Sequence, residues 1–129
     1  MVGRKRSVTL TDGELRLMRV LWQLGPSTVA AVVDVLATGA RAPAYNSVLT
    51  LMRILENKGY VRHRKEGRAF VFAPLVDQSH ARRSAVRHML DRLFDNSPGS
   101  LVLSLLEHER VDEHELKHLR QLIQQHQER

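Results

Sequence analysis

The chain has 129 residues, of which 43% are hydrophobic and 26% charged, and it contains no cysteine. This length fits one domain with an appendage, and the composition is that of a globular protein. The lack of cysteine excludes disulfides, thiolate zinc sites and cysteine nucleophiles. Every apolar run is far shorter than the ~20 residues of a membrane-spanning helix, so we expect no membrane insertion. No secretion signal opens the sequence, which favours a cytoplasmic protein.

Positive charge is concentrated in the first part of the chain. The formal net charge is +6, and residues 1–75 carry 12 basic and 5 acidic side chains, whereas residues 76–129 carry 8 and 9. A basic segment joined to a neutral one indicates that the first meets a polyanion and that the second has another task. A basic surface without a specific partner is the alternative. We interpret residues 1–9, which hold three of the basic side chains, as a basic arm.

Two helices are predicted before residue 40. The segment Thr11-Asp12-Gly13-Glu14 has the Ser/Thr-x-x-Glu spacing of a capping box and therefore starts the first helix. Gly25-Pro26 ends that helix. Ser27 or Thr28 then caps a second helix, for which Gly39 is the predicted end.

A third helix is predicted over residues 44–58, and its two faces differ in chemistry. The apolar face repeats at three- and four-residue steps and holds Val48, Leu51, Met52 and Leu55. Another face is polar and holds Asn46, Thr50, Arg53 and Asn57. Residues 61–64 and 69–72 are predicted strands of a hairpin with glycine in its turn. Three helices followed by a hairpin form the order of a winged helix-turn-helix.

The polar face and the hairpin have the chemistry of DNA recognition. The major groove of B-form DNA accepts one helix, in which Asn pairs with adenine, Arg pairs with guanine and a Thr methyl contacts thymine. Cations around a hairpin turn suit the phosphate backbone or the minor groove. A solvated helix face and ordinary surface charge are the alternatives to this interpretation. The candidate DNA-binding residues are Thr11, Thr28, Tyr45, Asn46, Ser47, Thr50, Arg53, Arg62, Arg64, Lys65 and Arg68.

The rest of the chain is predicted to be three short helices with apolar stripes. These stripes would stay partly in contact with water unless they pack on the first domain or on a second copy. We expect a dimer, with packing on the same chain as the alternative. The fold class is then mainly α with a small β-hairpin wing, with a DNA-binding domain at 1–75 and a helical dimerisation domain at 76–129. The candidate dimer contacts are Met89, Leu90, Leu93, Phe94, Leu101, Leu105, Leu116, Leu119 and Ile123.

Several segments resemble the BlaI/MecI/CopY family of bacterial repressors. The first helix has the pattern Leu15-x-x-Met18-x-x-Leu21-Trp22, and residues 47–61 are similar to the family's T-V-x-T-x-L-x-R-L-x-x-K-G-h-h stretch. Residues 100–103 resemble its short C-terminal helix. The similarity covers residues 10–125. The second wing strand has the family's spacing in Arg68, Phe70, Phe72 and Pro74.

This resemblance implies a homodimeric winged-helix repressor that binds dyad-symmetric operators of the TACA/TGTA type and blocks resistance or efflux genes. Asn46 and Leu49 stand where the best-known members have basic residues, which leaves the half-site preference open. In the penicillinase branch a membrane sensor peptidase responds to β-lactams, and the repressor is cut at an Asn-Phe bond. That bond aligns with Ser104-Leu105 here, where neither residue matches. The cysteines with which the copper branch holds metal are absent, so no cofactor is implied.

Other classes of function find less support in the sequence. His114 and His118 are four apart with Glu115 between them, a spacing compatible with metal binding but more often found on a plain surface. The sequence has no glycine-rich phosphate loop and no G-x-S-x-G motif, so we expect no enzyme. A winged-helix module that docks on protein or RNA, without operator specificity, is the alternative to a repressor.

Overall fold

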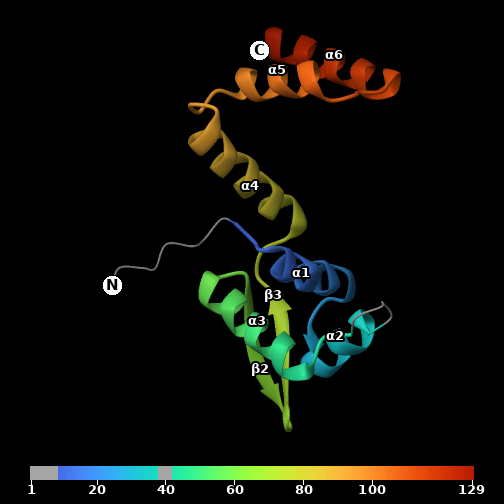
Figure 1. The fold of residues 1–129 in the computed structure, drawn as a ribbon, viewed down its shortest axis with the longest axis vertical. Coiled ribbons are helices and arrows are strands. Elements are labelled where there is room, and N and C mark those ends of the chain that lie inside the picture. Colours follow the sequence, from blue (N-terminus) through green and yellow to red (C-terminus); the bar gives the residue numbers. More distant parts are fainter. Residues whose placement is uncertain (1–8, 38–41) are drawn as a thin grey trace. The chain divides into compact units, whose positions relative to one another are not determined.

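The computed structural model in Figure 1 describes residues 9–37 and 42–129. Most of the predicted basic arm at residues 1–9 and the predicted helix end at Gly39 therefore lie outside the described residues. The described chain is mainly helical with one small antiparallel sheet, which confirms the predicted fold class. None of its helices combines the length and the hydrophobicity that crossing a bilayer would need. The elements in chain order are α1 (Asp12–Leu24), β1 (Ser27–Thr28), α2 (Val29–Leu36), α3 (Tyr45–Lys58), β2 (Val61–Glu66), β3 (Ala69–Pro74), α4 (Gln78–Leu93), α5 (Pro98–His108) and α6 (Glu113–Gln127).

Short-range chemistry sets the ends of the first helices. The capping box is confirmed, because Glu14 N–H donates to Thr11 Oγ1 at 3.2 Å and Thr11 N–H donates to Glu14 Oε1 at 2.9 Å. Thr28 caps α2 by accepting from the N–H of Ala31 at 3.1 Å. Helix α3 ends at Gly59, which has φ 88 and ψ 14 and so occupies the left-handed region that glycine tolerates best.

The sheet has three strands in the order β1-β3-β2, one more than the predicted hairpin. Strands β2 and β3 are joined by a two-residue turn whose first residue, Gly67, has φ 61. The two-residue strand β1 pairs with β3 through Ser27 opposite Phe72 and Thr28 opposite Val71. Because β1 is too short to show an alternating pattern, the sequence contains no signal for it.

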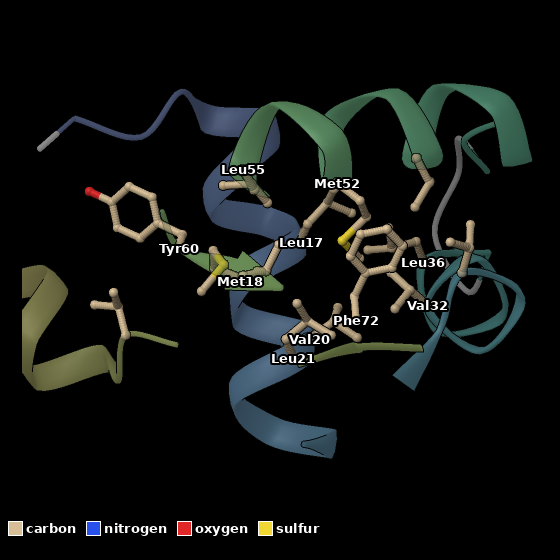
Figure 2. Close-up of a cluster of buried hydrophobic side chains, with 14 residues drawn as sticks. Leu17, Met18, Val20, Leu21, Val32, Leu36, Met52, Leu55, Tyr60 and Phe72 are labelled. Carbon is tan, nitrogen blue, oxygen red and sulfur yellow. The ribbon is translucent and has the colours of Figure 1, made fainter. Parts of the chain in front are cut away.

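One hydrophobic core joins α1, α2, α3 and the sheet, and Figure 2 shows its side chains converging between the helices. Leu17 and Met18 come from α1, Met52 and Leu55 from α3, and Phe72 from β3. All of these side chains are at most 2% exposed. Helix α3 is therefore fixed through its apolar face, and its opposite face is left for solvent or a ligand.

The described chain divides into two units, Met1–His88 and Met89–Arg129. The expected boundary lay after residue 75, before α4. Val76 nevertheless belongs to the core of the first unit, and Ala81 packs against that core. The indole Nε1 of Trp22 in α1 donates to the carbonyl of Val76 at 2.7 Å, which ties the segment leading into α4 to the first unit. With this boundary the first unit holds 15 basic and 6 acidic side chains, so the positive charge is still more concentrated there.

The second unit consists of the end of α4 and helices α5 and α6. Residues 89–129 are all described, and Leu90 is the one buried hydrophobic residue among them, at 4% exposed. Asp95 and Asn96, with φ 47 and 60, turn the chain between α4 and α5. Ser97 and Asp112 cap α5 and α6 by accepting from backbone N–H groups. Regular helices are therefore present, but by themselves they enclose little apolar surface.

Candidate nucleic-acid interface

Helix α3 carries the predicted polar face on its exposed side. Val48, Met52 and Leu55 are buried. Asn46 and Arg53 are exposed, because they lie on the other side of the helix. The remaining predicted residues of this helix, Tyr45, Ser47 and Thr50, are exposed as well. The helix thus presents a row of polar side chains that a groove of nucleic acid could contact.

Most of these side chains have no partner among the residues that the structure describes. In the described part of the chain, the side chains of Asn46 and Arg53 make no hydrogen bond or ion pair. Thr50 differs, since its hydroxyl donates to the backbone carbonyl of Asn46 at 2.9 Å. Thr50 therefore offers its methyl group and an oxygen lone pair. Asn46 and Arg53 keep their full hydrogen-bonding capacity for an external partner.

The start of α3 differs from the other helix starts of the described chain. Ala44 precedes the helix and provides no side-chain cap. Each of the other five helices begins with a side chain that accepts a hydrogen bond from a backbone N–H group. These accepting side chains belong to Thr11, Thr28, Asp77, Ser97 and Asp112. The first N–H groups of a helix have no intrahelical acceptor, and they favour an anion. Tyr45, whose side chain is 47% exposed, stands beside these groups.

The four cations of the hairpin surround it and do not line one side. Successive side chains of a β-strand point to opposite faces of the sheet. Alternation along β2 therefore puts Arg62 and Arg64 on one face and Lys65 on the other, with Arg68 in the turn. All four are exposed. Arg64 is engaged with Glu66, Nη2 to Oε2 at 2.6 Å, in a pair that water surrounds. This arrangement suits a wing that contacts phosphates on both sides.

The two candidate threonines have different surroundings. Both use the hydroxyl oxygen to cap a helix, accepting from the N–H of Glu14 and of Ala31. The first turn of α1 contains Asp12 and Glu14, whose negative charges disfavour a phosphate near Thr11. The first turn of α2 has no acidic residue. Thr28 is therefore the better position for a phosphate contact.

A buried ion pair that the sequence did not reveal holds the end of α3 to the start of α1. Lys58 Nζ lies 2.7 Å from Glu14 Oε1, and the Glu14 side chain is 3% exposed. Burial raises the pKa of Glu14. The hydrogen bonds from Lys58 and the Thr11 backbone, together with the Lys58 charge, outweigh burial and hold the pKa below its ordinary value. Sequence patterns identified Glu14 as a capping residue but contain no signal for a partner 44 residues away.

The candidate dimer contacts lie on helices with large exposed apolar side chains. Leu93 is 71% exposed, and Met89, Leu105 and Ile123 are also exposed. Leu90 is the exception, because it is buried in the single chain, and we no longer expect it to contact a partner. The remaining candidates are half-buried: Phe94, Leu101, Leu116 and Leu119.

The bond that aligns with the cleavage site of the penicillinase branch lies inside a helix. Ser104 and Leu105 belong to α5, four and three residues before its last residue, His108. Proteases cut exposed, extended segments far more readily than helix interiors. Cutting here would require local unfolding of α5, in addition to the mismatch of both residues.

Comparison with known proteins identifies relatives along almost the whole chain. The family model of the penicillinase repressor matches residues 10–125. A penicillinase repressor of Bacillus licheniformis is 29% identical over 126 residues, which cover 97% of each chain. The methicillin resistance regulatory protein MecI of Mammaliicoccus sciuri is 20% identical over 118 residues, 92% of this chain and 95% of that one. The solution structure of the DNA-binding domain of the repressor BlaI matches with a TM-score of 0.52 and 30% identity, over 60% of this chain and 93% of that domain.

Proposed function

The chain belongs to the penicillinase repressor family, and from this premise we propose that it represses transcription as a homodimer on a dyad-symmetric DNA operator. The family consists of transcriptional repressors and not of enzymes, as the resemblance predicted. Relatives are named for penicillinase repression and methicillin resistance, which supports antibiotic-resistance genes as targets. The expected operator has half-sites of the TACA/TGTA type.

The observation that carries this proposal is the exposed polar face of α3. Asn46 and Arg53 have donors and acceptors without partners in the described ranges 9–37 and 42–129, as base-edge reading requires. The same helix is held rigidly from behind by the core and by the Glu14–Lys58 pair. Base reading needs such rigidity, because a hydrogen bond to a base edge tolerates little positional error. We assign Arg53 to a guanine and Asn46 to an adenine.

The exposed apolar faces of the second unit support the homodimer. Two copies would bury side chains such as Leu93 and Ile123, which a single chain leaves in water. A two-fold dimer presents two recognition helices about one turn of DNA apart, or a multiple of it, and so selects a palindrome. The affinity of the dimer for the palindrome also rises, because binding of one half-site holds the second recognition helix at a high effective concentration near the other half-site.

The test is a selection from randomised duplexes followed by gel-shift titration at fixed salt. The wild-type protein should enrich a palindrome and bind it at least ~10-fold tighter than a scrambled duplex of the same composition. Arg53→Ala should weaken binding to the palindrome by about 1–3 kcal/mol while scarcely changing binding to the scrambled duplex.

Arg68→Ala is the matched control, because it removes the same charge from the turn of the hairpin. This variant should weaken binding to both duplexes alike and reduce the salt dependence by about one phosphate contact. Equal affinity of the wild type for both duplexes would refute the repressor and favour a docking module for protein or RNA. A uniform loss in Arg53→Ala would reassign Arg53 to the DNA backbone.

A further inference from the structure

One carboxylate joins the recognition helix to the wing. Glu56 lies in the last turn of α3, and His63 lies in β2. His63 Nδ1 is 2.8 Å from both carboxylate oxygens of Glu56, and the backbone N–H of His63 donates to Glu56 Oε2 at 3.0 Å. A single side chain of α3 therefore holds both the ring and the backbone of the wing residue.

Aromatic packing keeps the imidazole ring of His63 in this position. The ring meets Phe70 edge-on, with centroids 5.3 Å apart, and lies 5.4 Å from the ring of Phe72. Phe72 is itself part of the buried core. These two ring contacts restrict the imidazole, whose Nδ1 faces the Glu56 carboxylate. The pair is partly open to water, with side-chain exposures of 42% for His63 and 30% for Glu56.

The backbone bond has a separate significance, because β2 is an edge strand. The strand order β1-β3-β2 leaves one side of β2 without a neighbouring strand. Backbone N–H groups on such an edge have no partner in the sheet. The carboxylate of Glu56 takes the N–H of His63 and so attaches this edge to α3. A wing attached in this way cannot pivot freely about its connection to the helix.

The position of Glu56 is unfavourable for DNA binding on charge alone. It follows Arg53 by three residues on α3, so the two lie on neighbouring positions of the helix surface. Its partner His63 stands between Arg62 and Arg64 in β2. A carboxylate among groups assigned to bases and phosphates repels a polyanion. A role in holding the wing gives a physical reason for a negative charge at this position.

We propose that Glu56 and His63 are positioning residues that fix the wing relative to α3, so that base reading and backbone contact occur together. This inference rests on the proposed DNA-binding function and deepens it. Neither residue needs to touch DNA for this role. We call the contacts between Glu56 and His63 the tether. Loss of the tether leaves the helix and the wing intact but lets them engage DNA separately, which lowers discrimination between operator and other sequences.

The test compares Glu56→Ala with Glu66→Ala in the full-length protein. Each variant removes one negative charge from the wing region, but Glu66 pairs with Arg64 of its own strand and does not bridge to α3. Glu66→Ala should bind the selected palindrome and the scrambled duplex slightly tighter. The ratio of its affinity for the palindrome to its affinity for the scrambled duplex should stay unchanged. Glu56→Ala should lower that ratio about three- to five-fold, as expected from a partly exposed pair. Glu56→Gln keeps an acceptor for both N–H groups and should restore most of the ratio.

Amide hydrogen exchange in the free protein provides a readout that is independent of DNA. The His63 amide should exchange faster in Glu56→Ala than in wild type, while amides bonded between β2 and β3 keep their protection. If Glu56→Ala does not fold, His63→Phe preserves the aromatic packing and removes the Nδ1 bond, and it should lower the ratio in the same direction. An affinity ratio in Glu56→Ala equal to that in Glu66→Ala, or an unchanged His63 amide, would overturn the tether. A wild type without sequence preference would instead refute the proposed function.

Discussion

Replacing Lys58 by methionine removes the ammonium that faces the buried Glu14 carboxylate and keeps an aliphatic stem of similar length. The Glu14 side chain is 3% exposed, so its charge has little access to water. In the variant this carboxylate keeps the hydrogen bond from the Thr11 N–H but loses the Nζ at 2.7 Å. We expect the variant to fold, because the core around α3 is unchanged, but with lower stability.

The size of the loss follows from burial. Removing one partner of a fully buried ion pair costs about 3–5 kcal/mol, since it leaves an uncompensated charge. The Lys58 side chain is 23% exposed, so water partly screens this pair, and we reduce the expected loss to about 2–3 kcal/mol at pH 7. For a unit of this size that corresponds to a fall in Tm on the order of 10 °C.

The loss should depend on pH with a defined sign. The folded protein holds the pKa of Glu14 below 4.5, so the wild type gains stability from the pair above that pH and loses it as the pH falls further. In the variant, burial without Lys58 favours the protonated acid, so acidification removes its penalty. The difference in the free energy of unfolding between the two proteins should therefore be largest near neutral pH and shrink as the pH falls through 4.5.

Urea denaturation followed by circular dichroism, at neutral pH and at about pH 3, measures this difference. Lys65→Met is the control, because it removes an exposed lysine of the same unit and should change stability by less than about 0.5 kcal/mol. A loss in Lys58→Met as small as that of the control would show that the pair contributes nothing to stability. A loss that stays constant on acidification would show that Glu14 is not the partner that matters.

Two further predictions concern the ends of the first unit and the dimer. Trp22→Phe deletes the donor to the carbonyl of Val76 and should cost about 1–2 kcal/mol in thermal unfolding; an unchanged Tm would mean that this bond does not hold the segment before α4. Leu93→Glu combined with Ile123→Glu should convert the proposed dimer to monomer in analytical ultracentrifugation, because the introduced charges would be buried and repel across the interface. Leu24→Glu, on an equally exposed apolar position of the first unit, should leave the dimer intact, and a double variant that stays dimeric would place the interface elsewhere.

Much of the DNA-binding unit was predictable because its signals are local. The capping box at Thr11, the cap at Thr28 and the glycine end of α3 each depend on residues within four positions of one another. The exposed face of α3 followed from the 3.6-residue period alone, since burial of Met52 and its neighbours places Asn46 and Arg53 on the far side. The family resemblance, confirmed by the match over residues 10–125, extended these local signals to a complete winged helix.

Other features depended on pairs of residues that no sequence period connects. The strand β1 exists because two residues meet the middle of β3, Ser27 opposite Phe72 and Thr28 opposite Val71. The boundary between the two units lies after His88, inside α4, and not after residue 75 as predicted, because Val76 and Ala81 pack on the first core. Leu90 belongs to the same periodic apolar stripe as Met89 and Leu93, which are exposed, yet Leu90 itself is buried.

The amino-acid sequence by itself therefore determined the helices, their caps, the polar face of α3 and the concentration of positive charge. The tertiary structure alone decided which charged side chains meet: Lys58 with Glu14 across 44 positions, and His63 with Glu56 between wing and helix. The physical reason is that backbone period and capping act within a turn or two. The partner of a buried charge is set instead by which distant segments the hydrophobic core brings together.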